Sequence, residues 1–206
     1  MSPIALLVDF DGVIRRWSSD DAAIEKDCGL PVGAIRRIAF SPELLLPAIS
    51  GAVTDEAWRQ NAASELDRQY PGSSAHDAVV RWSSSPGELE PQVLAVLSCC
   101  RPDLRIVLAT NATSRLAGDL RTLGLSKRFY AVANSCELGA AKPSIAYFEA
   151  ALRCADVRAC DALFVDDSIS KIQAATEVGM LAHHFTGHEA MSAFLRREGV
   201  LAKNAL

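Results

Sequence analysis

Two aspartates stand where a buried strand would end near the start of the chain. Asp9 and Asp11 lie in the stretch VDFDGV, which closes the apolar run IALLV. In an extended segment, residues two apart point to the same side, so both carboxylates would enter one small volume. Gly12 then permits a sharp turn just beyond the strand, where open α/β sheets bind their ligands. An Asp-Gly turn with solvated carboxylates is the alternative for this stretch alone.

Three further groups of polar residues follow apolar runs or precede a helix. They are Thr110 and Asn111 after RIVLA, Lys142 in GAAKPS, and Asp166 and Asp167 after ALFV. The hydroxyl and amide of the first pair stand beside Thr113 and Ser114, which would open the next helix. They either hold an anion or cap that helix. A lysine just before a proline is ordinarily a solvated surface residue.

Together these groups would bind a cation and an anion side by side. Carboxylates that repel one another in a cleft need a cation, and hard oxygen ligands select Mg2+. A lysine and a hydroxyl nearby need an anion. A site that binds a divalent cation and an anion together is typical of phosphate chemistry. Four such groups on one face of one sheet make solvated turns a poor explanation of the whole set.

Short apolar runs that predict strands alternate with segments of helical period through most of the chain. The strands are expected at residues 4–8, 105–109, 130–134, 162–165 and 181–185. Helix-like segments follow the later strands, and several end in glycine, as helices commonly do. This alternation predicts βαβ units and a mostly parallel sheet, and therefore the α/β fold class.

A long interval separates the first expected strand from the second, and it must carry structure of its own. Several of its segments have helical period and are divided by proline or glycine breaks, one of them at Pro42. Thr54 is a good N-cap for the longest of these helices. We expect a small helical cap over residues 15–85, and an α/β core made of residues 1–14 and 86–206.

With these motifs in this order, the sequence resembles the haloacid dehalogenase superfamily, whose members are mostly phosphohydrolases. DFDGV, the strand ending in Thr110 and Asn111, Lys142 within GAAKPS, and FVDDS appear in the family's chain order. The match extends from residue 4 to about residue 185. The resemblance implies a Rossmann-like core with its strands in the spatial order 5-4-1-2-3. It also implies that the helical cap after the first strand is of the family's C1 class.

The resemblance assigns chemical roles to the quoted residues. Asp9 would attack phosphorus to form an aspartyl-phosphate, and Asp11 would protonate the leaving oxygen and later activate water. Thr110, Asn111 and Lys142 would bind the transferring phosphoryl group, and Lys142 would also neutralise the charge of Asp9. Thr110 and Lys142 are thus expected to be catalytic as well as substrate-binding.

Mg2+ is the cofactor that the resemblance implies. Asp166 would bind it together with the Asp9 side chain and the backbone carbonyl of Asp11. Asp167 would support the metal directly or through water. The metal would screen the nucleophile from the phosphate, since both are anions. Many relatives have an asparagine where this chain has Lys171, a departure that concerns the surroundings of the metal.

On these grounds we expect a Mg2+-dependent phosphoric monoester hydrolase that acts on a small phosphorylated metabolite. The dehalogenases of the family work without a metal and lack an acid at the position of Asp11, so this residue favours phosphate. Three alternatives stay open. They are a phosphomutase of the same superfamily, a catalytically idle member that serves as a binding module, and a phospho-receiver signalling domain, whose motifs would come in a different order.

The stretch VIRRW is expected to face the leaving group of the substrate. Arg15, Arg16 and Trp17 are candidates for contacts with an anionic or ring-bearing substrate, and Arg15 and Trp17 are assigned to substrate binding. A solvated surface is the alternative for both arginines. His183 and His184 are expected near the sheet edge and not in catalysis.

Composition and charge exclude several classes of protein. The 206 residues are half hydrophobic and carry a formal charge of -4, which predicts a folded, soluble chain without a nucleic-acid or membrane partner. The first apolar run is too short for a signal peptide or a spanning helix, so we expect a cytoplasmic protein. The six cysteines lack metal-site spacing and are expected to be reduced thiols in the core.

Overall fold

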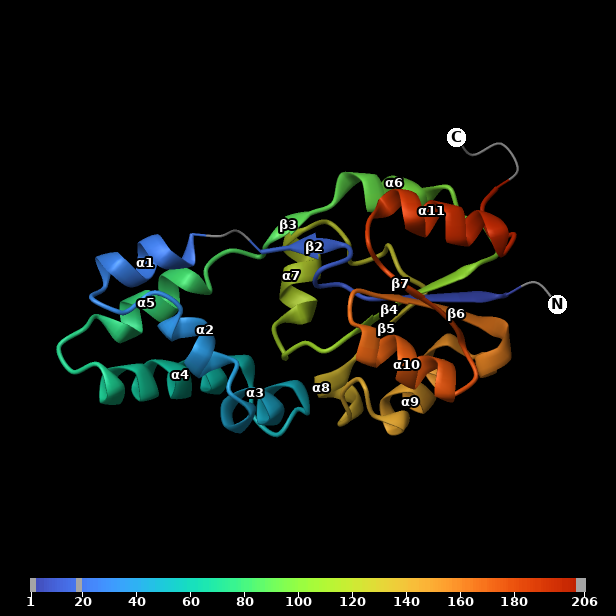
Figure 1. Cartoon of the computed structure of the whole chain (residues 1–206). Coiled ribbons are helices and arrows are strands. Elements are labelled where there is room, and N and C mark those ends of the chain that lie inside the picture. The colour runs from blue at the N-terminus through green and yellow to red at the C-terminus, as the bar shows by residue number, and fades with distance from the viewer. Residues whose placement is uncertain (1–2, 18–19, 203–206) are drawn as a thin grey trace.

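A computed structural model describes residues 3–17 and 20–202. At its centre is a five-stranded parallel sheet in the order β5-β4-β1-β6-β7 (Figure 1). The strands are β1 (Ala5–Val8), β4 (Arg105–Thr110), β5 (Ala131–Asn134), β6 (Ala162–Asp166) and β7 (Leu181–His184). Counted along the chain, this is the expected order 5-4-1-2-3. The predicted α/β fold and its strand order are therefore confirmed.

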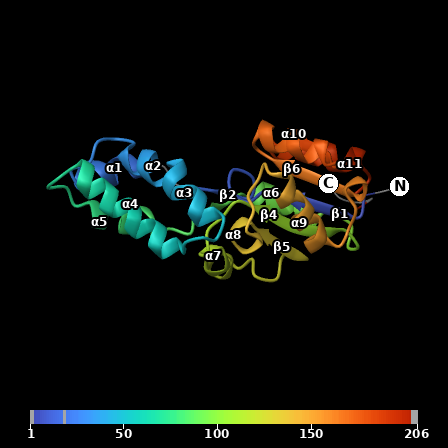
Figure 2. The same ribbon diagram turned by 90° about the horizontal axis from the view of Figure 1, so that it is seen from below.

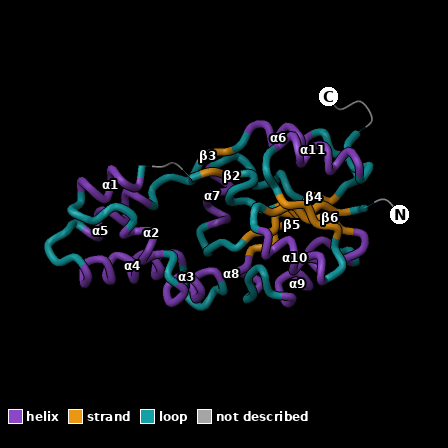
Figure 3. The backbone as a smooth tube through the Cα atoms, viewed as in Figure 1, coloured by secondary structure: helices purple, strands orange, loops and turns teal. Residues whose placement is uncertain are grey.

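Helices cover both faces of this sheet, and Figure 3 shows the strands as a layer between them. On one face lie α6 (Pro91–Ser98), α7 (Leu116–Thr122) and α11 (His188–Arg197); on the other lie α9 (Ile145–Ala155) and α10 (Ile169–Glu177). Leu6 and Val8 of β1 point into the first layer, and Ala5 and Leu7 point into the second. A strand that is buried on both faces must be continuously apolar, which explains the run ALLV.

A group of helices lies beyond the carboxyl edge of the sheet, as Figures 1 and 2 both show. We call this group the helical insert; it contains α1 (Asp21–Asp27), α2 (Ala34–Ala39), α3 (Pro42–Ile49), α4 (Asp55–Gln69) and α5 (Ala75–Trp82). These helices bury apolar clusters of their own, separate from the two layers on the sheet. An antiparallel ribbon of β2 (Arg15–Arg16) and β3 (Glu88–Leu89) joins the insert to the sheet.

Local sequence signals explain several of the helix starts. The Thr54 hydroxyl accepts a hydrogen bond from the Ala57 backbone N–H at 3.1 Å, so its predicted N-cap role is confirmed. The break between helices that was predicted at Pro42 is confirmed, because α2 ends at Ala39 and α3 begins at Pro42. The first helical turn tolerates proline because its N–H groups have no partner within the helix. The short α8 (Ser135–Leu138) and the 3-10 turn η1 (Ala159–Asp161) were not expected.

Two further predictions from the sequence concern the state of the cysteines and membrane-spanning helices. All six cysteines are free thiols; Cys28 and Cys100 are buried, whereas Cys160 is exposed. The prediction of core thiols is therefore confirmed for the two buried residues and wrong for Cys160. Within residues 3–17 and 20–202, no helix has the length and apolar character needed to cross a membrane.

Candidate active site

The carboxyl ends of three neighbouring strands and the start of α9 bring the polar groups together. Asp9 directly follows β1, Thr110 ends β4 and Asp166 ends β6. Lys142 lies three residues before α9. All four are almost completely buried, with exposed fractions of 2% for Asp9, 1% for Thr110, 0% for Asp166 and 4% for Lys142. Buried charges are retained only when they are paired, so these groups must be held by one another or by a ligand.

Lys142 links two of the carboxylates. Its Nζ lies 2.9 Å from Asp9 Oδ1 and 2.6 Å from Asp166 Oδ2, and it donates a hydrogen bond to the Ala109 carbonyl at 2.7 Å. Three acceptors thus use the three protons of the ammonium group. The lysine is a fixed positive charge at the floor of the site, and the solvated-surface alternative is wrong.

Asn111 fixes the backbone that carries this lysine. Its side-chain amide donates to the Lys142 carbonyl at 2.8 Å, and the Lys142 N–H donates to Asn111 Oδ1 at 2.8 Å. The N-cap position of α7 is taken by Arg115, so the alternative in which Asn111 caps that helix is wrong. This arrangement makes Asn111 a positioning residue for Lys142.

Thr110 presents a buried hydroxyl without a protein partner. Among the described residues, no hydrogen-bond partner lies within reach of its Oγ1, although the atom is inaccessible to solvent. An unpaired buried hydroxyl costs free energy unless a ligand satisfies it. Its place at the end of β4 suits an anion bound at the carboxyl edge of the sheet.

Three carboxylates form a cluster that fits a divalent cation. One oxygen each from Asp9, Asp166 and Asp167 lie within 4.8 Å of one another. Hard carboxylate oxygens in this number are the donors that Mg2+ prefers, so the residues fit the implied metal. The Asp11 carboxylate lies outside the cluster found in the described part of the chain, and the resemblance had assigned only its backbone carbonyl to the metal.

Gly12 makes room for one member of this cluster. A Cβ on this residue would lie 2.1 Å from Asp167 Oδ2, and its φ of +85° is strained for any other residue. The turn after β1 therefore needs glycine for two independent reasons. It allows Asp167 to approach the end of β1 closely.

Lys171 adds a second positive charge to the same carboxylates. Its Nζ lies 3.2 Å from Asp9 Oδ2 and 3.3 Å from Asp166 Oδ1, and 21% of its side chain is exposed. It reaches the site from the first turn of α10. The residue that departs from the family pattern is thus in direct contact with two of the candidate metal ligands.

The positive charges act differently on the pKa values of the two buried carboxyl groups. Burial acts to raise the pKa of Asp9, but the nearby ammonium groups of Lys142 and Lys171 outweigh it, and the pKa lies below its usual value. Burial raises the pKa of Asp166, and the negative charge of Asp9 adds to this effect. The surroundings of Asp9 therefore favour its ionised form more than those of Asp166 do.

Asp11 is held at the edge of the site by two neighbours. Arg15 donates to its carboxylate at 2.7 and 3.1 Å, and the indole N–H of Trp17 donates to Oδ1 at 2.9 Å. Arg15 is only 3% exposed and also donates to Asp119 at 2.8 Å. The solvated alternative is therefore wrong for Arg15, whereas the Arg16 side chain is 64% exposed and pairs with Glu90.

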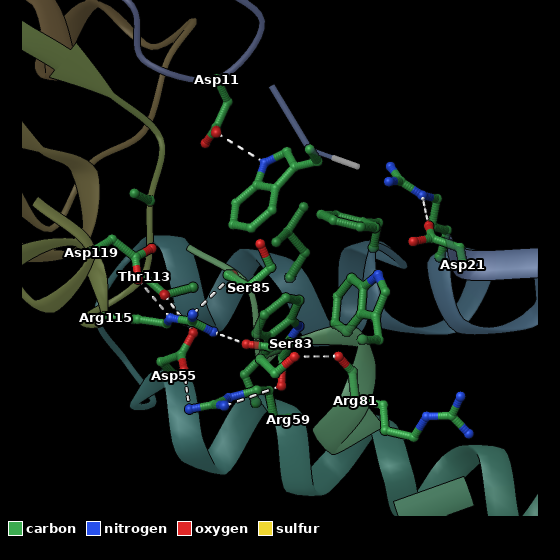
Figure 4. Close-up of a pocket in the computed structure, with 18 of the residues that line it drawn as sticks. Asp11, Asp21, Asp55, Arg59, Arg81, Ser83, Ser85, Thr113, Arg115 and Asp119 are labelled. Atoms are coloured by element: carbon green, nitrogen blue, oxygen red, sulfur yellow. Dashed lines mark hydrogen bonds and ion pairs between the residues drawn. The ribbon is translucent and has the colours of Figure 1, made fainter. Parts of the chain in front are cut away.

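Asp11 opens onto a pocket of about 690 Å³ between the sheet and the helical insert (Figure 4). Asn111 and Thr113 line it from the sheet side, and Asp55 and Arg59 line it from α4. Asp55 also connects the two walls, because the Thr113 hydroxyl donates to its Oδ1 at 2.6 Å. Sequence reasoning missed these residues from α4, since no local pattern shows which face of an inserted helix meets the sheet.

The chain belongs to the haloacid dehalogenase-like hydrolase family, whose pattern matches residues 5–179. A haloacid dehalogenase-like hydrolase domain-containing protein 3 from Xenopus laevis is 33% identical over 129 residues, which make up 62% of this chain and 49% of that protein. The chain therefore spans about half the length of this curated relative.

Solved structures share the fold at lower sequence identity. A family enzyme from Bacteroides thetaiotaomicron, in complex with magnesium and inorganic phosphate, has a TM-score of 0.69 and 19% identity, covering 87% of this chain and 92% of that one. A 2-haloacid dehalogenase from Pseudomonas syringae has a TM-score of 0.63 and 22% identity, covering 90% and 86%. These similarities establish the fold of the present chain.

Proposed function

We propose that this protein is a Mg2+-dependent phosphoric monoester hydrolase that acts on a small phosphorylated metabolite. The observation that carries the proposal is the pair of carboxylates after β1, of which Asp9 contacts the buried Lys142 while Asp11 faces the pocket. This arrangement supports attack by Asp9 and proton transfer to a leaving group by Asp11.

In the first half-reaction, a carboxylate oxygen of Asp9 attacks phosphorus. The P–O bond to the leaving group breaks, and Asp11 gives its proton to the departing oxygen. The product is an aspartyl-phosphate on Asp9 and a free alcohol. The contact between Lys142 Nζ and Asp9 Oδ1, at 2.9 Å, orients the nucleophile and offsets negative charge beside the phosphoryl group.

In the second half-reaction, water attacks the phosphorus of the aspartyl-phosphate. Asp11, now ionised, takes a proton from this water, and the bond between phosphorus and Asp9 breaks to release inorganic phosphate. The buried, unpaired hydroxyl of Thr110 supports a role in donating a hydrogen bond to a phosphoryl oxygen in both steps.

Asp9, Asp166 and Asp167 are the residues that would hold Mg2+. When bound, the metal supplies positive charge that offsets the repulsion between an anionic nucleophile and an anionic substrate. A bound phosphate and magnesium in the Bacteroides thetaiotaomicron enzyme support this chemistry for the fold.

We also propose that the helical insert works as a C1-type cap over residues 15–85 on a core of residues 1–14 and 86–206. Its separate apolar clusters and the ribbon of β2 and β3 support this division. The six free cysteines support a reducing compartment such as the cytoplasm.

Asp11 and the carboxylate cluster favour phosphate over a halide. A halide leaving group needs no proton and no metal, whereas in this chain an acid faces the pocket and three carboxylates nearby fit a divalent cation. A phosphomutase is the second candidate, because the helical insert forms one wall of the pocket in which an acceptor alcohol would bind.

The proposal is tested by phosphate release from an aryl phosphate, with and without Mg2+, for the wild type and Asp9→Asn. Turnover should require Mg2+ and fall by at least about a thousandfold in the variant. Asp103→Asn is the matched control, because this aspartate is 70% exposed and lies ahead of β4, at the opposite edge of the sheet. Hydrolysis that persists in Asp9→Asn would overturn the proposal.

A further inference from the structure

The pocket beside Asp11 is the space into which a leaving group must extend. If Asp11 protonates the leaving oxygen, the atoms bonded to that oxygen lie next to Asp11, and Asp11 is part of the pocket wall. Its volume of about 690 Å³ is far larger than a phosphate group requires. The chemistry of this wall therefore indicates the kind of alcohol that the enzyme releases.

Aromatic rings dominate one part of this wall. The chain has three tryptophans, and all three, Trp17, Trp58 and Trp82, line the pocket. Phe40 joins Trp58 and Trp82 in a cluster whose ring centroids are 5.9 to 6.0 Å apart, each pair edge to face. Such a cluster binds a flat apolar ring well, because it offers faces and edges in several directions.

Trp17 brings an aromatic surface next to the reacting atoms. Its indole N–H donates to Asp11 Oδ1 at 2.9 Å, and the residue is 41% exposed. A ring attached to the leaving oxygen would lie beside this indole while the oxygen meets Asp11. The aromatic wall thus extends from the proton donor to the helical insert.

Each arginine of the wall is already paired with an aspartate. Among the described lining residues are five arginines and five aspartates. Arg15 and Arg115 pair with Asp119, Arg59 pairs with Asp55 at 2.6 Å, Arg36 pairs with Asp21, and Arg81 pairs with Asp27 at 3.0 Å. Figure 4 shows Arg115 between Asp119 and the carbonyls of Ser83 and Ser85. A second anionic group on the substrate would have to compete with these carboxylates for a guanidinium.

We propose that the substrate is a phosphate monoester of an uncharged alcohol or phenol that carries an aromatic ring, and that this ring binds between Trp17 and the Phe40, Trp58 and Trp82 cluster. The proposal rests on the proposed phosphatase function and adds the class of leaving group. The sequence left two classes of substrate open, anionic and ring-bearing, and the composition of the pocket wall favours the ring-bearing class.

The first test compares two substrates that differ in their leaving groups. For 2-naphthyl phosphate the leaving group is an uncharged double ring, and for 3-phosphoglycerate it carries a carboxylate. The wild type should have a kcat/KM at least about tenfold higher for 2-naphthyl phosphate, and Trp82→Leu should reduce this ratio by about tenfold. Tyr130→Leu is the matched control, because Tyr130 is 57% exposed and lies outside the pocket wall. A preference for 3-phosphoglycerate would overturn the inference.

The second test measures binding without chemistry. Titration calorimetry with 2-naphthol, the free leaving group, should give saturable binding that Trp82→Leu weakens and Tyr130→Leu leaves unchanged. If no phosphate ester is hydrolysed but this result is obtained, the phosphatase proposal fails and the ligand class of the pocket stands. Absence of 2-naphthol binding to the wild type, or equal binding to Trp82→Leu, would overturn the inference whatever the enzyme hydrolyses.

Discussion

Asp9 contacts two ammonium groups, and the two have different positions around it. Lys142 approaches Oδ1 from within the core and is fixed by Asn111 through the backbone. Lys171 approaches Oδ2 from the partly exposed side and also reaches Asp166 Oδ1. Both lysines therefore contact the candidate metal ligands Asp9 and Asp166, but the Lys142 side chain is fully buried, whereas 21% of the Lys171 side chain is exposed.

Lys171→Asn should strengthen Mg2+ binding. The substitution removes a positive charge that lies 3.2 to 3.3 Å from Asp9 and Asp166, so the metal no longer has to displace it. We expect the Kd for Mg2+ to fall about tenfold, or by about 1.4 kcal/mol, measured by titration calorimetry.

Lys171→Arg is the control for this measurement, because it keeps the positive charge and should keep a Kd close to that of the wild type. Unchanged or weaker Mg2+ binding in Lys171→Asn would contradict the view that the lysine competes with the metal. Replacing Lys171 by asparagine would then give no electrostatic gain in Mg2+ binding.

The motif residues could be predicted because their signals are local. Asp9 and Asp166 follow short apolar runs of the kind that form buried strands, and parallel strands bring their carboxyl ends to one edge. The pairing of Asn111 with the backbone of Lys142 could not be predicted, because it depends on the path of a loop. The same limit applies to Lys171, whose reach depends on the angle at which α10 begins.

At the scale of elements, β7 and α11 meet through an aromatic stack. The ring of His183 lies 4.7 Å from that of Phe194 with an interplanar angle of 9°. As expected, His183 and His184 lie on an edge strand of the sheet. Burial lowers the pKa of His183, and the charges of Arg197 and His184 lower it further.

This shift predicts a pH dependence of stability. Because the folded protein binds a proton at His183 less readily than the unfolded chain does, stability is lost as the pH falls below about 6.5 towards the folded-state pKa. His183→Phe keeps a ring against Phe194 and removes the titrating group. Urea unfolding at about pH 7.5 and about pH 5.5 should show a smaller loss of unfolding free energy in the variant. An equal loss in both proteins would contradict this role.

At the scale of the whole molecule, the sheet edge carries the candidate catalytic groups and the helical insert forms the second wall of the pocket. The insert is docked by Asp55, whose carboxylate accepts from the Thr113 hydroxyl and whose N–H donates to Ser114 Oγ at 2.9 Å. A Cβ on Gly51 would lie 2.1 Å from the Cys136 carbonyl, which shows how closely α3 approaches α8.

The helices of the insert were predictable from their period, but their docking was not. Thr113 and Ser114 illustrate the difference. Their sequence suits a helix start, yet α7 begins at Leu116 and both hydroxyls contact Asp55 instead. Contacts between segments nearly 60 residues apart leave no local pattern in the sequence. The aromatic wall of the pocket and its paired charges could therefore not be predicted from the sequence.

The most direct test of the account is to locate the covalent intermediate. Asp11→Asn should form the aspartyl-phosphate from 4-nitrophenyl phosphate, whose leaving group needs little protonation, and should lose it slowly because no base activates water. After acid quenching and borohydride reduction, mass spectrometry of the peptides identifies the phosphorylated residue. The account predicts modification of Asp9 that requires Mg2+. Steady release of phosphate with an unmodified Asp9, or with modification at another residue, would contradict it.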